Sequence, residues 1–449
     1  MKIRRIQIPH FRALQDVDLT FEPGFEQQIF PLGSRNGGGK STLLQLIFTL
    51  LKCSSRPKQH HYLRNILSDF IHPPDVSEKR IASITLSFDD RAAEEPAAPA
   101  EGLGAQIVPE VPRTAAQDLE LQFLSLGPRL LKEMFDDESS AFGFEVFRKG
   151  PKAQWADHQS RIKHFLKAKN LLFITTFSPH SSPPAQGPGY AALAARVAGK
   201  SHGRLEEQLA RASKSIFLLG PSMQQYLFLE RAYRRSLVAT SESYKYAPLE
   251  NETNQKESAA IMYARVVATA ETKLPGFFAY DWLSIEPLLR LFQQARDQDF
   301  ADVVKTGRYG NHYTTMLNEI NSLLHHKHVR PLEDLSGIQF TTQSPGGEEV
   351  ALDLEDLSRG ELKRLMIYAW LKANQTDGGV VLIDEIEVSF HPDWQSGIVR
   401  ELWEWAPQNQ YILATHSYEV CEALTPAHIR ELAPKLATNP NPKTNASGS

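Results

Sequence analysis

The sequence GSRNGGGKST, residues 33–42, stands between the apolar run QQIFPLG and the segment TLLQLIFTLLKC. The first run predicts a short buried strand, and the apolar spacing of the second predicts a helix. In such a unit small residues let backbone N–H groups surround phosphate oxygens, and the helix adds its positive N-terminus. The stretch therefore predicts a phosphate-binding loop, against the alternative of a simple glycine-rich turn.

The polar residues of this loop have expected roles. Lys40 is expected to reach the β- and γ-phosphates of a nucleotide, and the Ser41 hydroxyl to bind Mg²⁺. The strict pattern has glycine six residues before the lysine, whereas this chain has Ser34 there and Gly33 one position earlier. The residues expected around the phosphates are Ser34, Arg35, Asn36, Gly37, Gly38, Gly39, Lys40, Ser41 and Thr42.

Two adjacent carboxylates follow another apolar run far downstream. VVLI at 380–383 predicts a buried strand that delivers Asp384 and Glu385 at its end. Ligands of open α/β sheets bind at the carboxyl ends of strands. Asp384 is therefore expected to hold Mg²⁺, and Glu385 to polarise the attacking water as a general base.

Two shorter motifs complete the set. Ser358 and Gly360 in LSRGE precede a predicted helix, where a serine cap and free backbone N–H groups can face an anion. His416 closes the predicted strand YILATHS and can donate to a γ-phosphate oxygen. Taken singly these are an ordinary cap and an ordinary strand-end residue, but their order and spacing with Lys40 and Asp384 favour one shared site.

Together, NGGGKST, LSRGE, LIDEIEVSFHPDWQ and ATHS resemble the Walker A, signature, Walker B with D-loop, and switch-histidine motifs of ABC-type ATPases. They are most similar to the SMC, RecF and OLD-like group of AAA-family ATP-binding proteins. HPDWQ is typical of the branch with the ATPase subunits of bacterial anti-phage systems such as Septu. The resemblance covers roughly residues 1–60 and 335–420, and it departs from the usual pattern at Ser34, Arg359 and Ile386.

The resemblance implies ATP and Mg²⁺ as cofactors, with Glu385, His416 and Lys40 as catalytic residues. In this family two heads enclose two nucleotides, so it also implies a homo-oligomer of at least two copies. Ser358 and Gly360 of one subunit would then contact the γ-phosphate held by Lys40 of another.

The family's Q-loop glutamine has two candidates. They are Gln224 and Gln225 in IFLLGPSMQQYLFL, and Gln225 is favoured.

The predicted fold class is α/β, an ABC-type P-loop ATPase head with a mixed sheet, plus a mainly helical insertion domain. The N-terminal lobe is expected at 1–229, with a disordered loop near 91–117 that is rich in Ala, Pro and Glu. The insertion is expected at 230–335, the C-terminal lobe at 336–435 and a flexible tail at 436–449. Further strands are expected in IASITLSF, LELQFLSL, FGFEVF and NLLFITTF, with a loop and then a helix after the last of these.

The composition further restricts the kinds of protein that this chain can be. The 449 residues are 41% hydrophobic and 23% charged, which is ordinary for a globular protein, and the net charge is −4. That charge argues against coating nucleic acid through overall electrostatics. Because the chain has two cysteines, no signal-peptide core and no long apolar stretch, we expect a cytoplasmic protein without a membrane segment.

Two functions stay open on these residues. The first is an ATP-driven switch subunit that controls a partner effector, such as an HNH or toprim nuclease, in anti-phage defence. The alternative is a RecF-like ATPase clamp on DNA, in which the basic stretch 148–169 would contact nucleic acid, although a solvated helix face also explains this stretch. A membrane-transporter subunit is disfavoured by the weak signature and the large insertion.

The chain itself is not expected to cut nucleic acid. Asp297, Asp299 and Asp302 alternate in a polar segment that is typical of a solvated face. The histidines of LLHHKHV, at 325, 326 and 328, are expected on different sides of a helix rather than around a metal.

Overall fold

The computed structural model describes residues 1–34, 37–67, 70, 76–88, 118–127, 130, 164–167, 169, 171–177, 191–198, 205–221, 273–280, 285–332 and 337–432. Several predicted features lie outside these residues. They are Arg35, Asn36, the glutamine pair 224–225, the strand FGFEVF, the loop 91–117, the tail 436–449 and most of the basic stretch.

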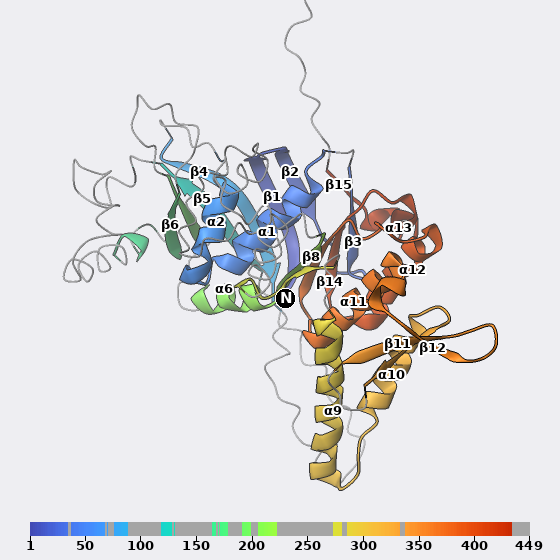
Figure 1. The fold of residues 1–449 in the computed structure, drawn as a ribbon. Coiled ribbons are helices and arrows are strands. Elements are labelled where there is room, and N and C mark those ends of the chain that lie inside the picture. Colours follow the sequence, from blue (N-terminus) through green and yellow to red (C-terminus); the bar gives the residue numbers. More distant parts are fainter. Residues whose placement is uncertain are drawn as a thin grey trace, which may run out of the picture.

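One six-stranded antiparallel sheet is built mainly from the N-terminal part of the chain (Figure 1). Its order is β2-β1-β4-β5-β7-β6, with every neighbouring pair antiparallel. The strands are β1 (Lys2–Phe11), β2 (Leu14–Thr20), β4 (Glu78–Ser87), β5 (Asp118–Leu126), β6 (Phe173–Phe177) and β7 (Ala191–Val197). The strands predicted in IASITLSF, LELQFLSL and NLLFITTF are thus confirmed.

Strand β7 corrects one expectation from the sequence. A helix was expected after the loop that follows β6, but the next described element is this strand, and α6 (Leu205–Lys214) comes only after it. Strand β7 pairs with β5 and β6, and its residues Ala192, Ala194 and Ala195 are fully buried. Pairing on both edges therefore outweighs the helix propensity of alanine.

The second six-stranded sheet is parallel and has the order β15-β3-β14-β13-β8-β9. Its strands are β3 (Ile29–Gly33), β8 (Ile216–Gly220), β9 (Phe277–Ala279), β13 (Val380–Asp384), β14 (Gln410–Ala414) and β15 (Arg430–Glu431). In the register Asp384 pairs with Ala414, and Ala414 pairs with Leu32. The loops that follow β3, β13 and β14 therefore leave the sheet at one edge.

Hydrophobic cores cover both faces of this parallel sheet. Val380 and Leu382 face the core that holds α1 (Lys40–Cys53) and the antiparallel sheet, whereas Val381 and Ile383 face the other core. The second core is built mainly on α9 (Glu286–Thr306), α10 (His312–Ser322), α11 (Arg359–Ala373) and α12 (Pro392–Trp405). Burial on both faces explains why β13 is a continuous apolar run.

The remaining helices are short. They are α2 (His60–Leu67), α13 (Tyr418–Glu422) and the 3₁₀ turns η1 (Pro57–Gln59), η6 (Leu354–Asp356) and η7 (Pro426–His428). A three-stranded antiparallel sheet of β10 (Lys327–Pro331), β11 (Ile338–Gln343) and β12 (Glu349–Leu352) lies beside α10.

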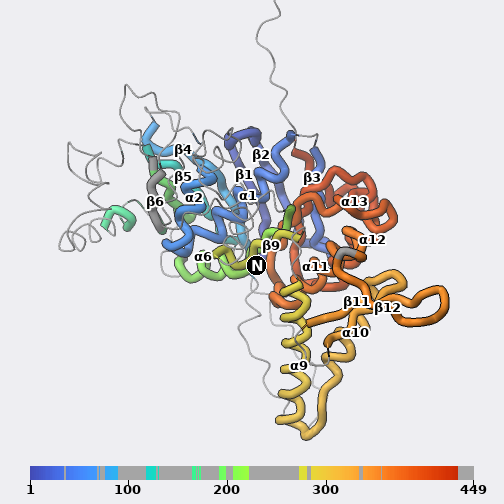
Figure 2. Tube along the Cα trace, viewed as in Figure 1, coloured from blue at the N-terminus to red at the C-terminus, as the bar shows by residue number. Residues whose placement is uncertain are grey.

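The described part of the expected insertion is not helical throughout. Helices α9 and α10 extend away from the two large sheets (Figure 2). However, β9 belongs to the parallel sheet, and β10 pairs with β11 beyond residue 335. The domain boundaries remain predictions.

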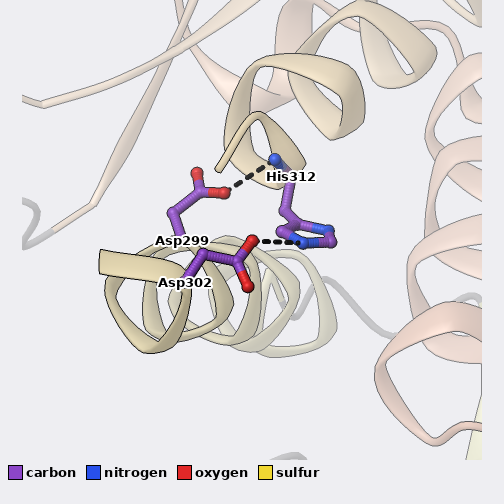
Figure 3. Close-up of side chains that lie close together, drawn as sticks. All are labelled: Asp299, Asp302 and His312. Atoms are coloured by element: carbon purple, nitrogen blue, oxygen red, sulfur yellow. Dashed lines mark hydrogen bonds and ion pairs between the residues drawn. The ribbon is translucent and has the colours of Figure 1, made fainter. Parts of the chain in front are cut away.

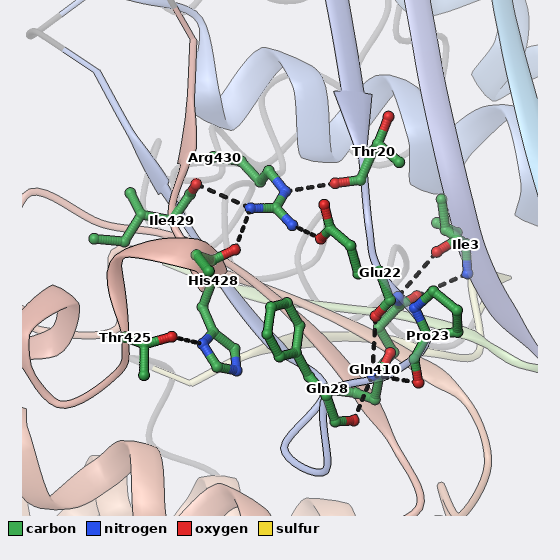
Figure 4. A network of polar contacts seen from close by, with 12 residues as sticks. Ile3, Thr20, Glu22, Pro23, Gln28, Gln410, Thr425, His428, Ile429 and Arg430 are labelled. Carbon is green, nitrogen blue, oxygen red and sulfur yellow. Dashed lines mark hydrogen bonds and ion pairs between the residues drawn. The ribbon is translucent and has the colours of Figure 1, made fainter.

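A polar network ties the two ends of the described chain together (Figure 4). Arg430 in β15 donates to the carbonyl of Thr20 and forms an ion pair with Glu22. The Gln410 amide bridges the backbone of Ile3, accepting from its N–H at 2.7 Å and donating to its carbonyl at 2.9 Å. These contacts join both large sheets into one unit, and its α/β class is the one that the sequence predicted.

In the part of the chain that the structure describes, none of the helices has both the length and the apolar character needed to span a bilayer.

Candidate nucleotide-binding site

The motif residues of distant segments meet in one pocket. A cavity of about 210 Å³ is lined by Ala13, Gly37, Gly38, Gly39, Lys40, Ser41, Thr42, Asp384, Glu385, Ala414 and His416. The parallel register explains this, because the loops after β3, β13 and β14 leave the sheet at the same edge. The structure therefore brings the phosphate loop, the acidic pair and the histidine together.

The loop has the backbone that requires glycine. Gly37 and Gly39 have φ angles of +79° and +85°, in the left-handed region. A Cβ on Gly39 would also lie 2.8 Å from Cδ2 of Leu14, which follows the turn between β1 and β2. The start of the chain thus packs against the phosphate loop and fixes one wall of the pocket.

The Lys40 side chain lies inside this pocket and is 6% exposed. Its Nζ donates to the carbonyl and to Oγ of Ser34, both at 3.2 Å, and lies 3.0 Å from Nε2 of His416. Burial lowers the pKa of Lys40, although the carboxylates of Glu387, Asp384 and Glu385 oppose this shift. The Ser34 hydroxyl therefore contacts the lysine ammonium, which a glycine at this position could not do.

The acidic pair occupies two different environments. Asp384 ends β13 and is 2% exposed, while Glu385 is half-buried. Glu385 has a φ of +51°, and its N–H donates to the carbonyl of Ala414 at 2.9 Å, which extends the parallel ladder by one step. The turn after β13 therefore redirects the chain just where the general base is expected.

A third acid, Glu387, connects this turn to the loop that carries His416. Its Oε2 accepts from the Thr415 hydroxyl and its Oε1 accepts from the His416 N–H, both at 2.7 Å. Tyr280 and Lys363 contact the same turn from the other side. No sequence motif pointed to the roles of these three residues. Only Lys363 had a visible signal, as a charged residue within the apolar face of a predicted helix.

The signature residues stand apart from this pocket. Ser358 is exposed and caps α11, where its Oγ accepts from the Glu361 N–H at 3.2 Å and its own N–H donates to the Glu361 carboxylate at 2.9 Å. Neither Ser358 nor Gly360 lines the cavity that holds Lys40. A Cβ on Gly360 would lie 2.6 Å from the carbonyl oxygen of Ser389, so glycine is required there by packing within the chain.

The donor set fits a nucleotide with Mg²⁺. The Ser41 hydroxyl and the Asp384 carboxylate line the same cavity, and hydroxyl, carboxylate and phosphate oxygens are the ligands that Mg²⁺ prefers. The glycines leave the space beside Lys40 open to phosphate oxygens.

A second group of possible metal donors has a structural explanation (Figure 3). The ligand atoms of Asp299, Asp302 and His312 lie within 4.8 Å of one another at the junction of α9 and α10. Asp299 accepts from the backbone N–H groups of His312 at 2.7 Å and Tyr313 at 3.0 Å, so it caps α10. The expectation of a solvated face is therefore wrong for Asp299, which is 8% exposed.

The histidines near residue 325 do not lie on a helix as expected. Helix α10 ends at Ser322, and His328 lies in β10. His325, His326 and His328 are all exposed, and the metal-donor group at Asp299 does not include them.

Comparisons with known proteins agree with this site. Residues 222–422, somewhat less than half of the chain, match a family described as "AAA domain, putative AbiEii toxin, Type IV TA system". The "Retron Vc95 probable ATPase" of Vibrio cholerae serotype O1 biovar El Tor is 34% identical over 106 residues, which are 23% of this chain and 20% of that protein. The "Retron Ec83 probable ATPase" of Escherichia coli is 35% identical over 91 residues, which are 18% of this chain and 17% of that protein. The matched region thus spans a fifth or less of each retron protein.

Among solved structures, an Smc head domain from Pyrococcus furiosus with an extended coiled coil, bound to the C-terminal domain of ScpA, covers 94% of this chain. The match covers 91% of the Smc chain, with 13% identity and a TM-score of 0.40. A score of this size does not bear on the assignment, which depends on the sequence matches and on the pocket. These agree with one another: residues 222–422 are similar to an AAA domain family, the two relatives are named as probable ATPases, and the pocket gathers the residues expected of a nucleotide site.

Proposed function

We propose that this protein binds and hydrolyses ATP, and that it does so as an oligomer with composite nucleotide sites. The observation that carries the proposal is the convergence of Lys40, Asp384, Glu385 and His416 on one pocket. Their spacing of more than 370 residues along the chain makes a chance meeting of these four residue types improbable.

Each residue has a task that its position supports. Backbone N–H groups of the loop and the Lys40 ammonium bind the β- and γ-phosphates, for which Lys40 leaves its contact with His416. Ser41 and Asp384 hold Mg²⁺, which neutralises charge on the phosphate oxygens. Glu385 orients and deprotonates the attacking water, and His416 donates to the γ-phosphate.

The position of the signature supports oligomerisation. Ser358 and Gly360 do not line the chain's own pocket, yet α11 begins at Arg359 with its N-terminus exposed. A helix N-terminus is suited to bind an anion. We therefore assign this terminus to a nucleotide held by Lys40 of a second copy.

The biological role that we favour is a cytoplasmic switch subunit in anti-phage defence. ATP binding would change the assembly and so control a partner effector, such as an HNH or toprim nuclease. The names of the retron ATPases and of the matching family support a defence context. The basic stretch that would favour a DNA clamp lies mostly outside the described residues, so the clamp is not put forward.

The proposal is tested by separating nucleotide binding from turnover. Glu385→Gln is expected to bind ATP as the wild-type protein does and to lose at least about a hundredfold in kcat, because only the general base is removed. Lys40→Ala is expected to weaken ATP binding itself, since a cation on the phosphates is lost. Equilibrium binding of a fluorescent ATP analogue and phosphate release measure the two effects.

Glu404→Gln is the matched control, because Glu404 is an exposed acid on α12 that pairs with Arg400 four residues earlier. This variant should bind and hydrolyse ATP normally. Equal losses of affinity and turnover in Glu385→Gln, or normal affinity in Lys40→Ala, would contradict the assigned roles.

A further inference from the structure

The turn from Glu385 to Ser389 follows β13 and holds its backbone in strained conformations. The φ angles are +51° at Glu385 and +73° at Ser389, in the left-handed region that residues with a Cβ rarely adopt. Within the turn the Val388 N–H donates to the Glu385 carbonyl at 3.2 Å. Contacts from other elements must therefore hold this geometry, and with it the direction in which the Glu385 side chain leaves the backbone.

The principal contacts come from Lys363 in α11, whose side chain is buried at 4% exposure of the residue. Its Nζ donates to the carbonyl oxygens of Glu385 at 2.8 Å, Ile386 at 2.9 Å and Val388 at 3.0 Å. An ammonium has three N–H donors, so the three carbonyls can each receive one. The bonds are charge-assisted and buried, which makes them stronger than those of a neutral donor.

Tyr280, just after β9, completes the contacts from this side. Its Oη donates to the carbonyl of Asp384 at 2.7 Å and lies 3.1 Å from that of Glu385. The centroid of its ring lies 4.0 Å from Nζ of Lys363, and the Phe390 ring centroid lies at 5.1 Å. The aromatic faces stabilise the ammonium in the interior, where a buried cation would otherwise be unfavourable.

Lys363 also lies close to the signature. It is one helical turn after Gly360, whose Cα approaches the carbonyl of Ser389 so closely that a Cβ would lie 2.6 Å from it. The first two turns of α11 therefore contact both ends of the Glu385–Ser389 turn. A displacement of the helix N-terminus cannot occur without moving these carbonyls.

We propose that Lys363 is a positioning residue for ATP hydrolysis: through the carbonyls of the turn it aims Glu385 into the pocket, and it couples the signature helix to that residue. The inference rests on the proposed function. It adds that occupancy of the signature end of α11 by a partner's nucleotide adjusts the general base of the same chain. Tyr280 shares the positioning task from the side of β9.

Lys363→Met tests this role, because methionine keeps much of the side-chain volume and loses all three donors. We expect kcat to fall about tenfold or more, with ATP affinity within about twofold of wild type, since a group that positions the general base affects turnover rather than binding. Lys372→Met is the matched control. Lys372 lies on the same helix, with its ammonium 5.9 Å from the ring centroid of Tyr368, and its loss should leave kcat unchanged.

A double-mutant cycle separates positioning from general destabilisation. If Lys363 acts through Glu385, Lys363→Met should not lower the small residual rate of Glu385→Gln any further. A second tenfold loss in that background would overturn the proposal. Tyr280→Phe, which removes one hydroxyl and keeps the ring, provides a milder variant with an expected loss of about threefold in kcat at unchanged affinity.

Thermal unfolding confirms that the variants compared are folded. If Lys363→Met is folded and has the wild-type kcat, the positioning role is overturned and the proposed function stays intact. If Lys363→Met does not fold, a wild-type kcat in Tyr280→Phe has the same consequence. A wild-type protein that binds ATP without hydrolysing it would overturn the proposed function, and this inference with it.

Discussion

Lys52 is a charged residue in the interior of the protein, and it does not line the nucleotide pocket. It lies near the end of α1 and is 3% exposed. Its Nζ lies 3.5 Å from the carbonyl of Ile216 and 5.6 Å from the ring centroid of Phe217. Burial, together with the nearby charge of Arg56, lowers the pKa of Lys52 to about 8.

This lowered pKa predicts how stability depends on pH. Below pH 8 Lys52 is charged in both states, and the cost of burying the charge is fully present. Between pH 8 and 10.5 the unfolded state binds more protons than the folded state, so the contribution of Lys52 to the free energy of unfolding increases with pH.

Lys52→Met should therefore raise the melting temperature at pH 7, and its advantage over wild type should shrink between pH 8 and 10. The shift of 10.5 − 8 = 2.5 pKa units corresponds to a cost on the order of 3 kcal/mol. Lys58→Met, at an exposed position of η1, is the control and should show no such trend. A constant difference between Lys52→Met and wild type across this pH range would contradict the prediction.

Residues that act on a ligand can be recognised from the sequence, whereas residues that hold the backbone in place cannot. Lys40, Asp384, Glu385 and His416 stand beside glycines or at the ends of apolar runs, where polar side chains have few structural reasons to be. Lys363 and Tyr280 bind backbone carbonyl groups. Because every residue has a carbonyl group, the sequence does not show which of them is bound. Their role becomes visible only when the turn that they hold is seen.

Among the elements, the junction of α9 and α10 shows how one residue can serve a neighbouring helix. The Asn311 side chain at the start of α10 makes no capping hydrogen bond, and Asp299 supplies the acceptors from α9. Gly310 makes room for this, because a Cβ there would lie 2.7 Å from the carboxylate of Asp299 and 2.5 Å from that of Asp302.

We predict that Asp299→Ala destabilises the protein by about 1 kcal/mol, as loss of a helix cap does, with a lower melting temperature. Asp297→Ala is the control, since Asp297 is exposed on the same helix and pairs with the adjacent Arg296. Added Zn²⁺ or Mn²⁺ should leave the unfolding of the wild-type protein unchanged. Equal stability of the two variants would contradict the capping role, and stabilisation by either ion that Asp299→Ala abolishes would show a metal site.

Helices and strands could be predicted where the period of the apolar residues was clear. The prediction failed where pairing with neighbouring strands decides the conformation. The alternation in β1 and the continuous run of β13 follow from burial on one face and on two faces, respectively. Strand β7 did not follow, because the alanine-rich run AALAARV carries no strand signal of its own. Its conformation is set by β5 and β6, which lie on either side of it.

Across the whole chain, the signature residues lie outside the lining of the pocket that holds Lys40. The register of three parallel strands brings Gly33, Asp384 and Ala414 to one sheet edge, although more than 300 residues of chain separate Gly33 from the other two. The sequence predicted that edge from the ends of the apolar runs. The position of the signature outside this pocket was implied only by the resemblance to paired heads, because it depends on how α11 packs against the turn after β13.

If Ser358 completes a site on Lys40 of another copy, two inactive variants should complement each other. Ser358→Arg is expected to block the signature, and Lys40→Ala to disable the phosphate loop, so each alone should have little ATPase activity. Mixed at equal amounts and allowed to exchange subunits, they should recover about a quarter of wild-type activity for a dimer. Half of the pairs are then mixed, and each has one intact site of two.

The control for this experiment mixes Lys40→Ala with a chain that carries both substitutions. No pair in that mixture joins an intact phosphate loop to an intact signature, so it should stay inactive at every ratio. Phosphate release measures the activity, and labelled subunits confirm the exchange. Confirmed exchange with no recovery of activity in the first mixture would mean that the site is not shared between subunits. Recovery in both mixtures would mean that the substitutions do not act where the structure places them.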